Sequence, residues 1–359
     1  MSSKIKEEAK KNAENLEIER KFLLEKIPHG ISRLPHKRIA QTYLLSSKNN
    51  EIRLRKEGSQ HILTLKRGNG ISREENELKI SKDLFNYLWK SAPCGSPITK
   101  TRYILAYGGR KIEIDVFSGR LSGLITAEIE FESEEAARKF KPLPWFGNEI
   151  TFDENYKNKN LWNSINNRAE GIFSLEKGVQ VLNAAVDALV TLKKGRGQVI
   201  VLIASGSCSK ETAAIAKALA SHLNGDALLL STNNYYLGKM EALKKKKHGV
   251  VTNSDRNEAI YNTERLYNDL RKLKHGTTIQ MTVRNHKLLG RNDYMAVDPK
   301  SKKAVIVEGL FMLTDPLINI SDLSVYVDSS TYRSYLGRPA RQIDNADIIL
   351  QNKGHLHTQ

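Results

Sequence analysis

The sequence predicts two folds in series: an α+β domain built on a closed antiparallel β barrel with a charged interior, then a doubly wound α/β domain. Three observations lead to this expectation. Short segments of alternating charged and apolar residues fill the first half of the chain, as half-buried strands require. Their charges are sorted, since some segments carry only cations on the polar face and others only acids. In the second half, apolar strand runs alternate with helical patterns, which is typical of a parallel sheet.

Length and charge set the first limits. At 359 residues the chain is long enough for about two domains with separate cores. Its 57 Lys and Arg residues outnumber its 40 Asp and Glu residues, which gives a net charge of +17. Such a balance favours an anionic partner, either a nucleic acid or a polyphosphate substrate. The longest apolar runs, such as 199–204, are too short to cross a bilayer, so no membrane partner is expected. Two cysteines, too few for a disulfide framework and not spaced for zinc, fit a reducing cytoplasm.

Composition divides the chain into four expected parts. Residues 1–15 are rich in Lys, Glu and Asn and are expected to form a disordered or helical arm. The β-rich barrel domain should occupy 16–168. A connecting helix and hinge, 169–195, should lead to the α/β domain at 196–359.

Charged residues recur at alternate positions along the expected strands of the barrel domain. In the first strand, 16–24, Glu17, Glu19 and Lys21 share one face, because successive side chains of a strand point to opposite faces. Two carboxylates so placed repel each other unless a cation lies between them. The other expected strands are 38–45, 50–56, 61–66, 73–80, 99–107, 111–117, 124–132 and 148–152. Their charged faces carry the cations Arg53, Arg55, Lys66, Arg73, Lys100 and Arg102 and the acids Glu75, Glu77, Glu113, Asp115, Glu128, Glu130 and Glu149.

Two arrangements could accommodate this pattern. An open sheet would expose its charged face to water, but a solvated face usually mixes its signs. A closed barrel would place the charges in its lumen and leave an apolar outer face for helices or a partner subunit to cover. Charges at this density in an enclosed space are costly without counter-ions. A divalent metal for the acids and a polyanion for the cations would remove both costs, so the sorted pattern favours the barrel.

The motifs of this domain resemble a known family. They are, in order, EIERKFLL, QTYLL, EIRLRKEG, LTLKRGNGISREENE, KTRYIL, KIEIDVFSGRLSGLITAEIEFES and WFGNEITFDENYKNKNLW. Together they resemble the CYTH family, the triphosphate tunnel metalloenzymes, and most of all its short bacterial members that hydrolyse inorganic triphosphate. The resemblance implies an eight-stranded antiparallel tunnel that binds a triphosphate together with Mg²⁺ or Mn²⁺.

The resemblance also implies roles for individual residues. Metal binding is implied for Glu17, Glu19, Glu77, Asp115, Glu128 and Glu130. Contacts to phosphate oxygens are implied for Lys21, Arg53, Arg55, Lys66, Arg73, Lys100 and Arg102. Of these residues Lys21 and Lys100, with Glu17 and Glu19, are expected nearest the bond that breaks. The residue types suit the chemistry, since carboxylate oxygens are the ligands Mg²⁺ prefers and arginine forks match phosphate geometry.

The α/β domain opens like a phosphate-binding loop but departs from it in detail. An apolar strand run at 199–203 precedes a short loop and an alanine-rich helix, which is the layout of such a loop. In the pattern Gly-x-x-x-x-Gly-Lys-Ser/Thr, however, Ser205 replaces the first glycine, Lys210 the second and Glu211 the lysine. Only Thr212 fits. A glutamate facing nucleotide phosphates would be repelled by them.

This domain resembles the uridine kinase and phosphoribulokinase group of P-loop kinases. The supporting stretches are LLLSTNNYYL (228–237), TNSDRNEA (252–259), AVIVEGLFML (304–313) and NADIILQN (345–352). Where that group has an aspartate that accepts the proton of the substrate hydroxyl, this chain has Asn233, and an amide cannot act as that base. Glu308 matches the acidic residue expected after the fourth strand, and Arg333, Arg338 and Arg341 form a thin lid. The resemblance therefore implies a kinase fold without its transfer groups, a pseudokinase.

Three functions remain open from the sequence. The first is a metal-dependent triphosphatase, acting on inorganic tripolyphosphate, with a pseudokinase domain that regulates it, dimerises it or docks a partner. The second is a protein that binds or senses a triphosphate or polyphosphate without turnover. The third is an active nucleoside kinase with an ancillary tunnel. Nucleic acid is not the expected partner, because the four-lysine run at 244–247 has no aromatic interleaving or recognition motif.

Overall fold

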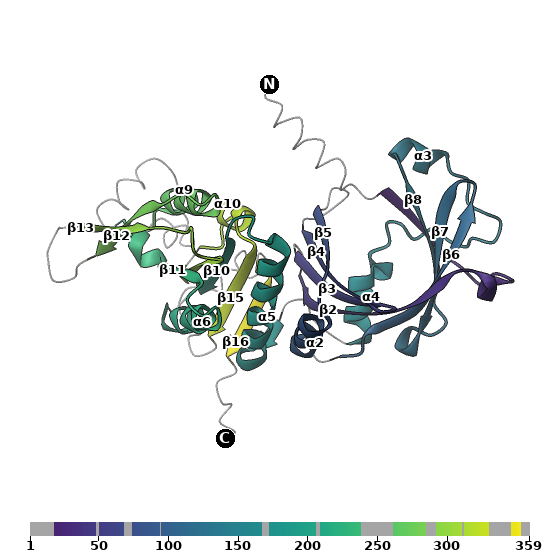
Figure 1. Cartoon of the computed structure of the whole chain (residues 1–359), viewed down its shortest axis with the longest axis horizontal. Helices are drawn as coiled ribbons and strands as arrows, with labels where there is room; N and C mark the ends of the chain where they lie inside the picture. The colour runs from purple at the N-terminus through teal and green to yellow at the C-terminus, as the bar shows by residue number, and fades with distance from the viewer. Residues whose placement is uncertain are drawn as a thin grey trace, which may run out of the picture. The chain divides into compact units, whose positions relative to one another are not determined.

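The computed structural model separates the chain into two compact units, Met1–Glu170 and Gly171–Gln359 (Figure 1). The structure describes residues 18–47, 50–67, 74–93, 95–166, 172–205, 209–237, 261–284, 292–310, 312–329 and 346–352. The expected arm at 1–15 lies outside these ranges, as do the lysine run at 244–247, the stretch 252–259 and the three lid arginines.

Unit 1 is built on eight antiparallel strands, which confirms the predicted strand number and direction. The strands are β1 (Ile18–Leu23), β2 (His36–Ser46), β3 (Asn50–Glu57), β4 (Gln60–Arg67), β5 (Glu74–Lys79), β6 (Ile98–Tyr107), β7 (Arg110–Ser118) and β8 (Ile125–Phe131). Their order across the sheet is β1-β8-β7-β6-β2-β3-β4-β5. The sheet curves into a half-barrel (Figure 1). Over the described residues β1 and β5 are its two edge strands, and they are not paired with each other.

Alternation sorts the two faces of the sheet as predicted. On β7, Ile112 and Ile114 are buried in an outer hydrophobic cluster with Phe22 of β1 and Ile129 of β8. Two short helices cover this outer face: α2 (Lys82–Ser91) contacts β2, β3 and β4, and α3 (Glu134–Lys139) contacts β1 and β8. The predicted serine caps are present at both helices: Ser81 accepts from the Leu84 amide and Ser133 from the Ala136 amide. The concave face is left to the charged residues.

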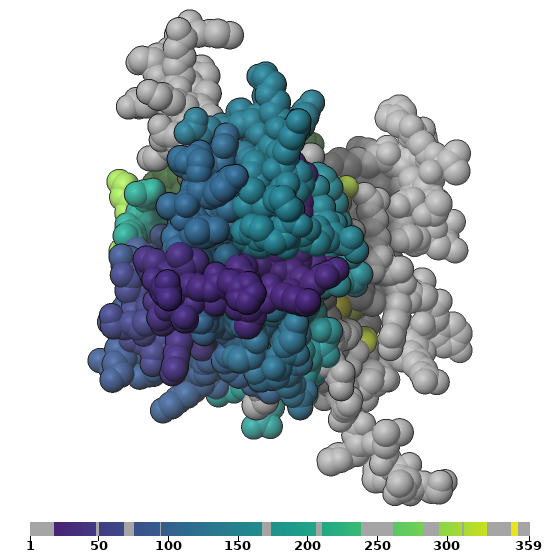
Figure 2. All heavy atoms as spheres, turned by 90° about the vertical axis from the view of Figure 1, so that its right-hand side faces the viewer, coloured from purple at the N-terminus to yellow at the C-terminus, as the bar shows by residue number. Residues whose placement is uncertain are grey.

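The segment after α3 covers the outer edge of β1. The expected strand at 148–152 is reduced to one bridge between Phe22 and Glu149, and the backbone bonds of 147–150 run to Lys21 and Leu23. In the space-filling view the start of the described chain (purple) lies as a band directly against later segments in teal (Figure 2). In a closed barrel the outer edge of β1 would pair with β5. Here the backbone groups of Lys21 and Leu23 on that edge are hydrogen-bonded by the segment 147–150 instead.

Helix α4 (Asn158–Ile165) lies inside the curve of the sheet, after a turn η3 (Glu154–Tyr156). Its Leu161 and Trp162 pack with Tyr43, Ile98 and Phe117 from β2, β6 and β7. The two remaining short turns of unit 1 are η1 (Ile31–Arg33) and η2 (Gly119–Leu121). The apolar side of α4 thus fills one end of the half-barrel.

Unit 2 is a six-stranded parallel sheet with helices on both faces, which confirms the predicted doubly wound fold. The strands are β9 (Ile172–Ser174), β10 (Val199–Ser205), β11 (Ala227–Ser231), β14 (Ala304–Leu310), β15 (Leu323–Ser329) and β16 (Ile348–Asn352), in the order β11-β14-β10-β15-β16-β9. Every residue of β10 is buried, as a central parallel strand requires. The hairpin of β12 (Ile279–Arg284) and β13 (Asn292–Val297) and the turn η4 (Thr232–Tyr235) complete the unit.

The helices of unit 2 divide between the two faces of its sheet. Leu266, Leu270 and Leu273 of α9 (Thr263–Lys274) and Leu317 of α10 (Asp315–Ile320) form one core with Leu202 of β10. Helices α5 (Leu175–Lys193) and α6 (Ser209–His222) contact each other and the sheet. Since α5 packs on β9, β10 and β16, it lies within unit 2, whereas the sequence assigned it to a connecting segment. The domain boundaries expected from the sequence stay predictions. None of the helices in the described ranges is long and apolar enough to span a membrane.

Candidate active site

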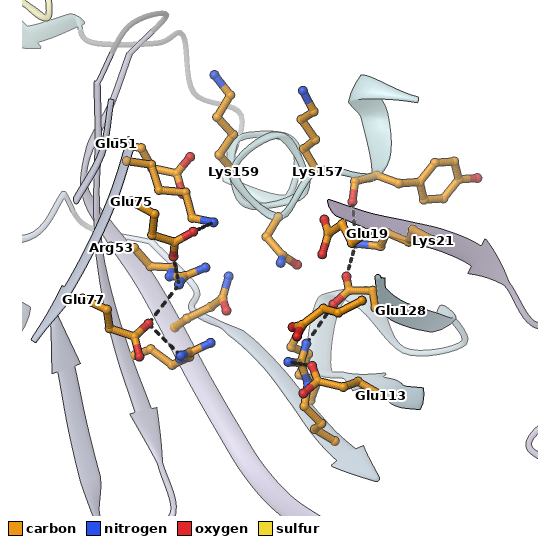
Figure 3. A pocket seen from close by; sticks show the side chains of 18 of the residues that line it. Glu19, Lys21, Glu51, Arg53, Glu75, Glu77, Glu113, Glu128, Lys157 and Lys159 are labelled. Atoms are coloured by element: carbon orange, nitrogen blue, oxygen red, sulfur yellow. Dashed lines mark hydrogen bonds and ion pairs between the residues drawn. The ribbon is translucent and has the colours of Figure 1, made fainter. Parts of the chain in front are cut away.

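The concave face of unit 1 lines a charged pocket of about 440 Å³. Figure 3 shows Glu51, Arg53, Glu75 and Glu77 on one wall, with Glu19, Lys21, Glu113 and Glu128 on the other. Lys157, the residue before α4, and Lys159 of α4 lie between the two walls (Figure 3). The acids in the lining are Glu19, Glu51, Glu57, Glu75, Glu77, Glu113, Glu128, Glu130 and Asp153, and the cations are Lys21, Lys37, Arg53, Arg55, Lys66, Lys100, Arg102, Lys111, Lys157 and Lys159. The predicted convergence of alternating charges on one pocket is therefore present, in a half-barrel whose described edge strands β1 and β5 are not paired with each other.

The wall formed by β6, β7 and β8 contains a buried network of two cations around one carboxylate. Asp115 of β7 is fully buried, and its two oxygens accept from Arg102 Nε at 2.7 Å and Arg102 Nη2 at 2.6 Å. Lys100 Nζ donates to the second of these oxygens at 2.5 Å. Burial acts to raise the pKa of Asp115, but the charges of Lys100 and Arg102 outweigh it and hold that pKa below its usual value. Burial in turn lowers the pKa of Lys100, so this ammonium gives up its proton more readily than an exposed lysine.

Lys21 and Glu128 join this wall to β1. Lys21 lies opposite Glu128 in the pairing of β1 with β8, and its Nζ is 2.8 Å from Glu128 Oε1. Arg102 Nη2 lies 3.1 Å from the other oxygen of Glu128. Burial raises the pKa of Glu128, yet the surrounding cations, Lys21 first among them, lower it well below its ordinary value. Glu128 is therefore ionised at neutral pH and shared by two cations.

The opposite wall, formed by β3, β4 and β5, carries a series of ion pairs between neighbouring strands. Arg55 Nη2 lies 2.9 Å from Glu77 Oε2, and Lys66 Nζ lies 2.6 Å from Glu75 Oε2. Arg53 lies farther from both acids, at 3.5 Å from Glu75 and 3.7 Å from Glu77. Each predicted cation of this wall that the structure describes thus has a carboxylate beside it.

Glu19 and Glu130 form the pair of acids that suits a metal ion. They are direct cross-strand partners in the pairing of β1 with β8, and both line the pocket. Like charges directly opposite each other destabilise a sheet, so a cation between them would be favourable. Mg²⁺ binds through one or two carboxylates plus substrate phosphates and keeps several waters. The donor set therefore fits a divalent metal.

The other predicted metal ligands do not gather around one point. Among the described residues no group of three or more His, Cys, Asp or Glu side chains is placed to hold a metal ion. Asp115, Glu128 and Glu77 are each engaged by cations. Glu17 and Arg73 lie outside the described residues. The metal and phosphate roles expected from the sequence stay predictions.

Several lining residues were missed by the sequence analysis. Glu51, Glu57 and Lys111 lie at alternate positions with residues already singled out, so the period of two on their strands would have found them. Lys37 lies on β2, where no residue was singled out and where the expected strand began only at 38. Lys37 pairs with Glu57, and Lys111 with Glu113. Other members carry no such signal. They are Tyr43, whose hydroxyl accepts from Gln41 Nε2 at 3.1 Å, and Lys157 and Lys159 at the start of α4.

In unit 2 two of the singled-out residues meet. Thr212 Oγ1 of α6 donates to Glu308 Oε2 at 2.9 Å, and both side chains are buried. Glu308 lies within β14, one strand position before Gly309, whereas the sequence analysis expected it after the strand. Asn233 lies in η4. The loop residues 206–208 lie outside the described residues.

A curved antiparallel sheet with a charged interior, followed by a parallel sheet with helices on both faces, defines the class of this two-unit chain. Residues 15–159 match the CYTH domain, and residues 199–335 match the Phosphoribulokinase / Uridine kinase family. An inorganic triphosphatase of Nitrosomonas europaea is 44% identical over 152 residues, which cover 42% of this chain and 98% of that protein. An inorganic triphosphatase of Acetivibrio thermocellus is 35% identical, covering 40% and 92%. The chain belongs to the CYTH family.

The second unit is similar to uridine kinases. A uridine kinase of Oceanobacillus iheyensis is 29% identical over 147 residues, which cover 40% of this chain and 68% of that protein. Both family resemblances expected from the motifs are thereby confirmed.

Proposed function

We propose that unit 1 is a divalent-metal-dependent triphosphatase that hydrolyses inorganic tripolyphosphate to diphosphate and phosphate. The observation that carries the proposal is the pocket itself, which cations from both walls line together. The two relatives named inorganic triphosphatases support it, since they align over nearly their whole length. Phosphoryl transfer needs mainly positioning and charge neutralisation from a protein, and this lining supplies both.

The cations of the two walls would bind opposite ends of the triphosphate. Arg53, Arg55 and Lys66 would receive one end of the phosphate chain, and Arg102 and Lys100 the other. Each guanidinium stays charged at all relevant pH values and can hold two oxygens at once. Because each of these cations already rests against a carboxylate, the substrate must replace the carboxylate contacts as it enters. The cost of this exchange is offset by the higher charge of the triphosphate.

Glu19 and Glu130 would hold the divalent metal, Mg²⁺ or Mn²⁺. When bound, the metal supplies neutralisation of phosphate charge and a water of lowered pKa. Lys21, next but one to Glu19 on the same face of β1, would lie beside the phosphate that leaves. Its ammonium can stabilise negative charge that develops there. Lys100, whose ammonium donates to Asp115, would add positive charge near the bond that breaks.

A substrate panel tests this proposal. Phosphate release from tripolyphosphate, nucleoside triphosphates and thiamine triphosphate would be measured with Mg²⁺, with Mn²⁺ and with EDTA. Release from tripolyphosphate that EDTA abolishes is the expected result. Tight calorimetric binding of tripolyphosphate with no release under any metal would instead establish a binding or sensing protein.

For unit 2 we propose a pseudokinase role, as a regulatory or docking module. The buried bond between Thr212 and Glu308 supports it, since two groups that would face a nucleotide-bound metal satisfy each other. The replacement of the expected base by Asn233 supports it as well. ATP-dependent phosphorylation of uridine by the whole protein, if it survived Glu19→Ala but not Thr212→Val, would make unit 2 an active kinase instead.

A further inference from the structure

Arg20 points away from the pocket although both its neighbours in sequence line it. Glu19 and Lys21 line the pocket, and Arg20 lies on the outer face of β1 with Phe22. Its guanidinium donates to both oxygens of Glu149, from Nε at 2.9 Å and from Nη2 at 2.6 Å. Its Nη1 donates to the carbonyls of Ala137 and Phe140, each at 2.9 Å. One side chain therefore ties β1 to the end of α3 and to the segment that covers the edge of β1.

Thr151 links Glu149 to the backbone of Lys21 by two hydrogen bonds. Thr151 Oγ1 donates to Glu149 Oε1 at 2.7 Å, and the same hydroxyl accepts from the Lys21 amide at 3.0 Å. The Lys21 carbonyl accepts from the Ile150 amide at 2.8 Å. Both backbone groups of Lys21 are thus satisfied on the side of β1 that faces away from β8.

The side chain of Lys21 is held by the same segment from inside the pocket. Its Nζ donates to the Tyr156 carbonyl at 3.1 Å and lies 2.8 Å from Glu128. The segment from Glu149 to Tyr156 therefore fixes Lys21 at its backbone and at its ammonium. An ordinary surface ion pair contributes little, but Arg20 is held bidentately and is mostly buried, at 18% side-chain exposure.

We propose that Arg20 and Glu149, which lie outside the pocket lining, and Thr151, which lies in it, form a positioning clamp that sets where the Lys21 ammonium stands inside the pocket. The inference rests on the proposed triphosphatase function, in which Lys21 acts on the substrate. Arg20 and Glu149 are positioning residues, since neither lines the pocket. Thr151 acts on Lys21 through its bonds to Glu149 and to the Lys21 amide. All three act by fixing the position of β1 relative to β8, which carries Glu128 opposite Lys21.

The direct test is Thr151→Val, which keeps the shape of the side chain and removes the hydroxyl at the centre of the clamp. A small displacement of a catalytic group costs up to roughly a hundredfold in rate, so we expect kcat for tripolyphosphate to fall about tenfold. The KM should change by less than about twofold, because the cations that bind the chain stay in place. Arg20→Ala should lower kcat further, and Arg20→Lys should restore part of the loss, since lysine reaches Glu149 but cannot hold it bidentately. The matched control is Glu134→Gln, which breaks an exposed ion pair with Arg138 on the same helix α3.

A second readout is independent of turnover. The rate at which Lys21 is acylated by a small amine-reactive reagent would be followed by peptide mass spectrometry in each variant. The clamp predicts faster acylation of Lys21 in Thr151→Val than in wild type and Glu134→Gln. If the wild type releases no phosphate but Thr151→Val still exposes Lys21, the clamp stands and the triphosphatase proposal fails. If the wild type is active while Thr151→Val changes neither kcat nor the acylation of Lys21, the clamp is refuted.

Discussion

Asp115→Asn should strongly destabilise unit 1. The carboxylate has no exposure to solvent, and three donors from Lys100 and Arg102 converge on it within 2.7 Å. An asparagine in its place keeps one acceptor oxygen and turns an N–H group toward two buried cations. Removing one partner of a buried ion pair costs about 3–5 kcal/mol. For a unit of this size each kcal/mol shifts the melting temperature by about 2–4 °C, so a fall of roughly 6–20 °C follows.

Differential scanning calorimetry can separate this effect from unit 2, because two units can unfold in two transitions. The transition of unit 1 should move and that of unit 2 should stay. Tripolyphosphate should raise the melting temperature of the variant more than that of wild type, since phosphate oxygens can take the place of the lost carboxylate charge. The matched control, Glu135→Gln, breaks an exposed pair with Lys139 and should shift the transition by less than about 2 °C. A shift of Asp115→Asn no larger than that of the control would refute the buried-network reasoning.

Three further predictions follow from the same geometry. Glu19→Ala should reduce Mg²⁺-dependent phosphate release by roughly two orders of magnitude, because one of two opposed metal ligands is lost; near-normal turnover would remove Glu19 from the metal site. Because the pKa values of Asp115 and Glu128 are lowered in the folded chain, these carboxylates are protonated in the unfolded chain at a higher pH than in the folded chain. Stability should therefore fall as the pH drops below about 4.5, the ordinary value for a glutamate, and Glu128→Gln should flatten that dependence in melts from pH 6 to pH 2.5. Thr212→Val should lower the melting temperature of unit 2 by a few degrees, since the buried Glu308 loses its donor. Unchanged tripolyphosphate turnover in this variant would favour the docking role of unit 2, and altered turnover the regulatory role.

The faces of the strands could be read from the sequence, and their partners could not. Glu113 and Asp115 alternate with Ile112 and Ile114, and a period of two places each pair on one face whatever the sheet order. Which cation meets which acid depends on strand order and register, which the local pattern does not contain. The contact of Lys21 with Glu128 arises because the first strand pairs with the last, a pairing of residues far apart in the chain.

Arg20 illustrates a second limit of sequence reasoning. It occupies an outer-face position beside Phe22, where period-two reasoning expects an apolar residue. Its partners Glu149 and the carbonyls at the end of α3 are 117 to 129 residues away. In the same way, the helix at 175–193 has an apolar pattern that indicates packing but not against which sheet. Only the fold shows that α5 packs on β9 and β16.

The pairing of cations with acids across the pocket bears on how the reaction would end. Before substrate enters, every described cation on the β3–β4–β5 wall has a neighbouring carboxylate, so the interior is close to electrically balanced. A chain of three phosphates has enough charge to separate these pairs, whereas each shorter product has less. As the products separate, the ion pairs of Lys66 with Glu75 and of Arg55 with Glu77 can form again. The carboxylates would then expel the products, and rebinding of free phosphate would be weak.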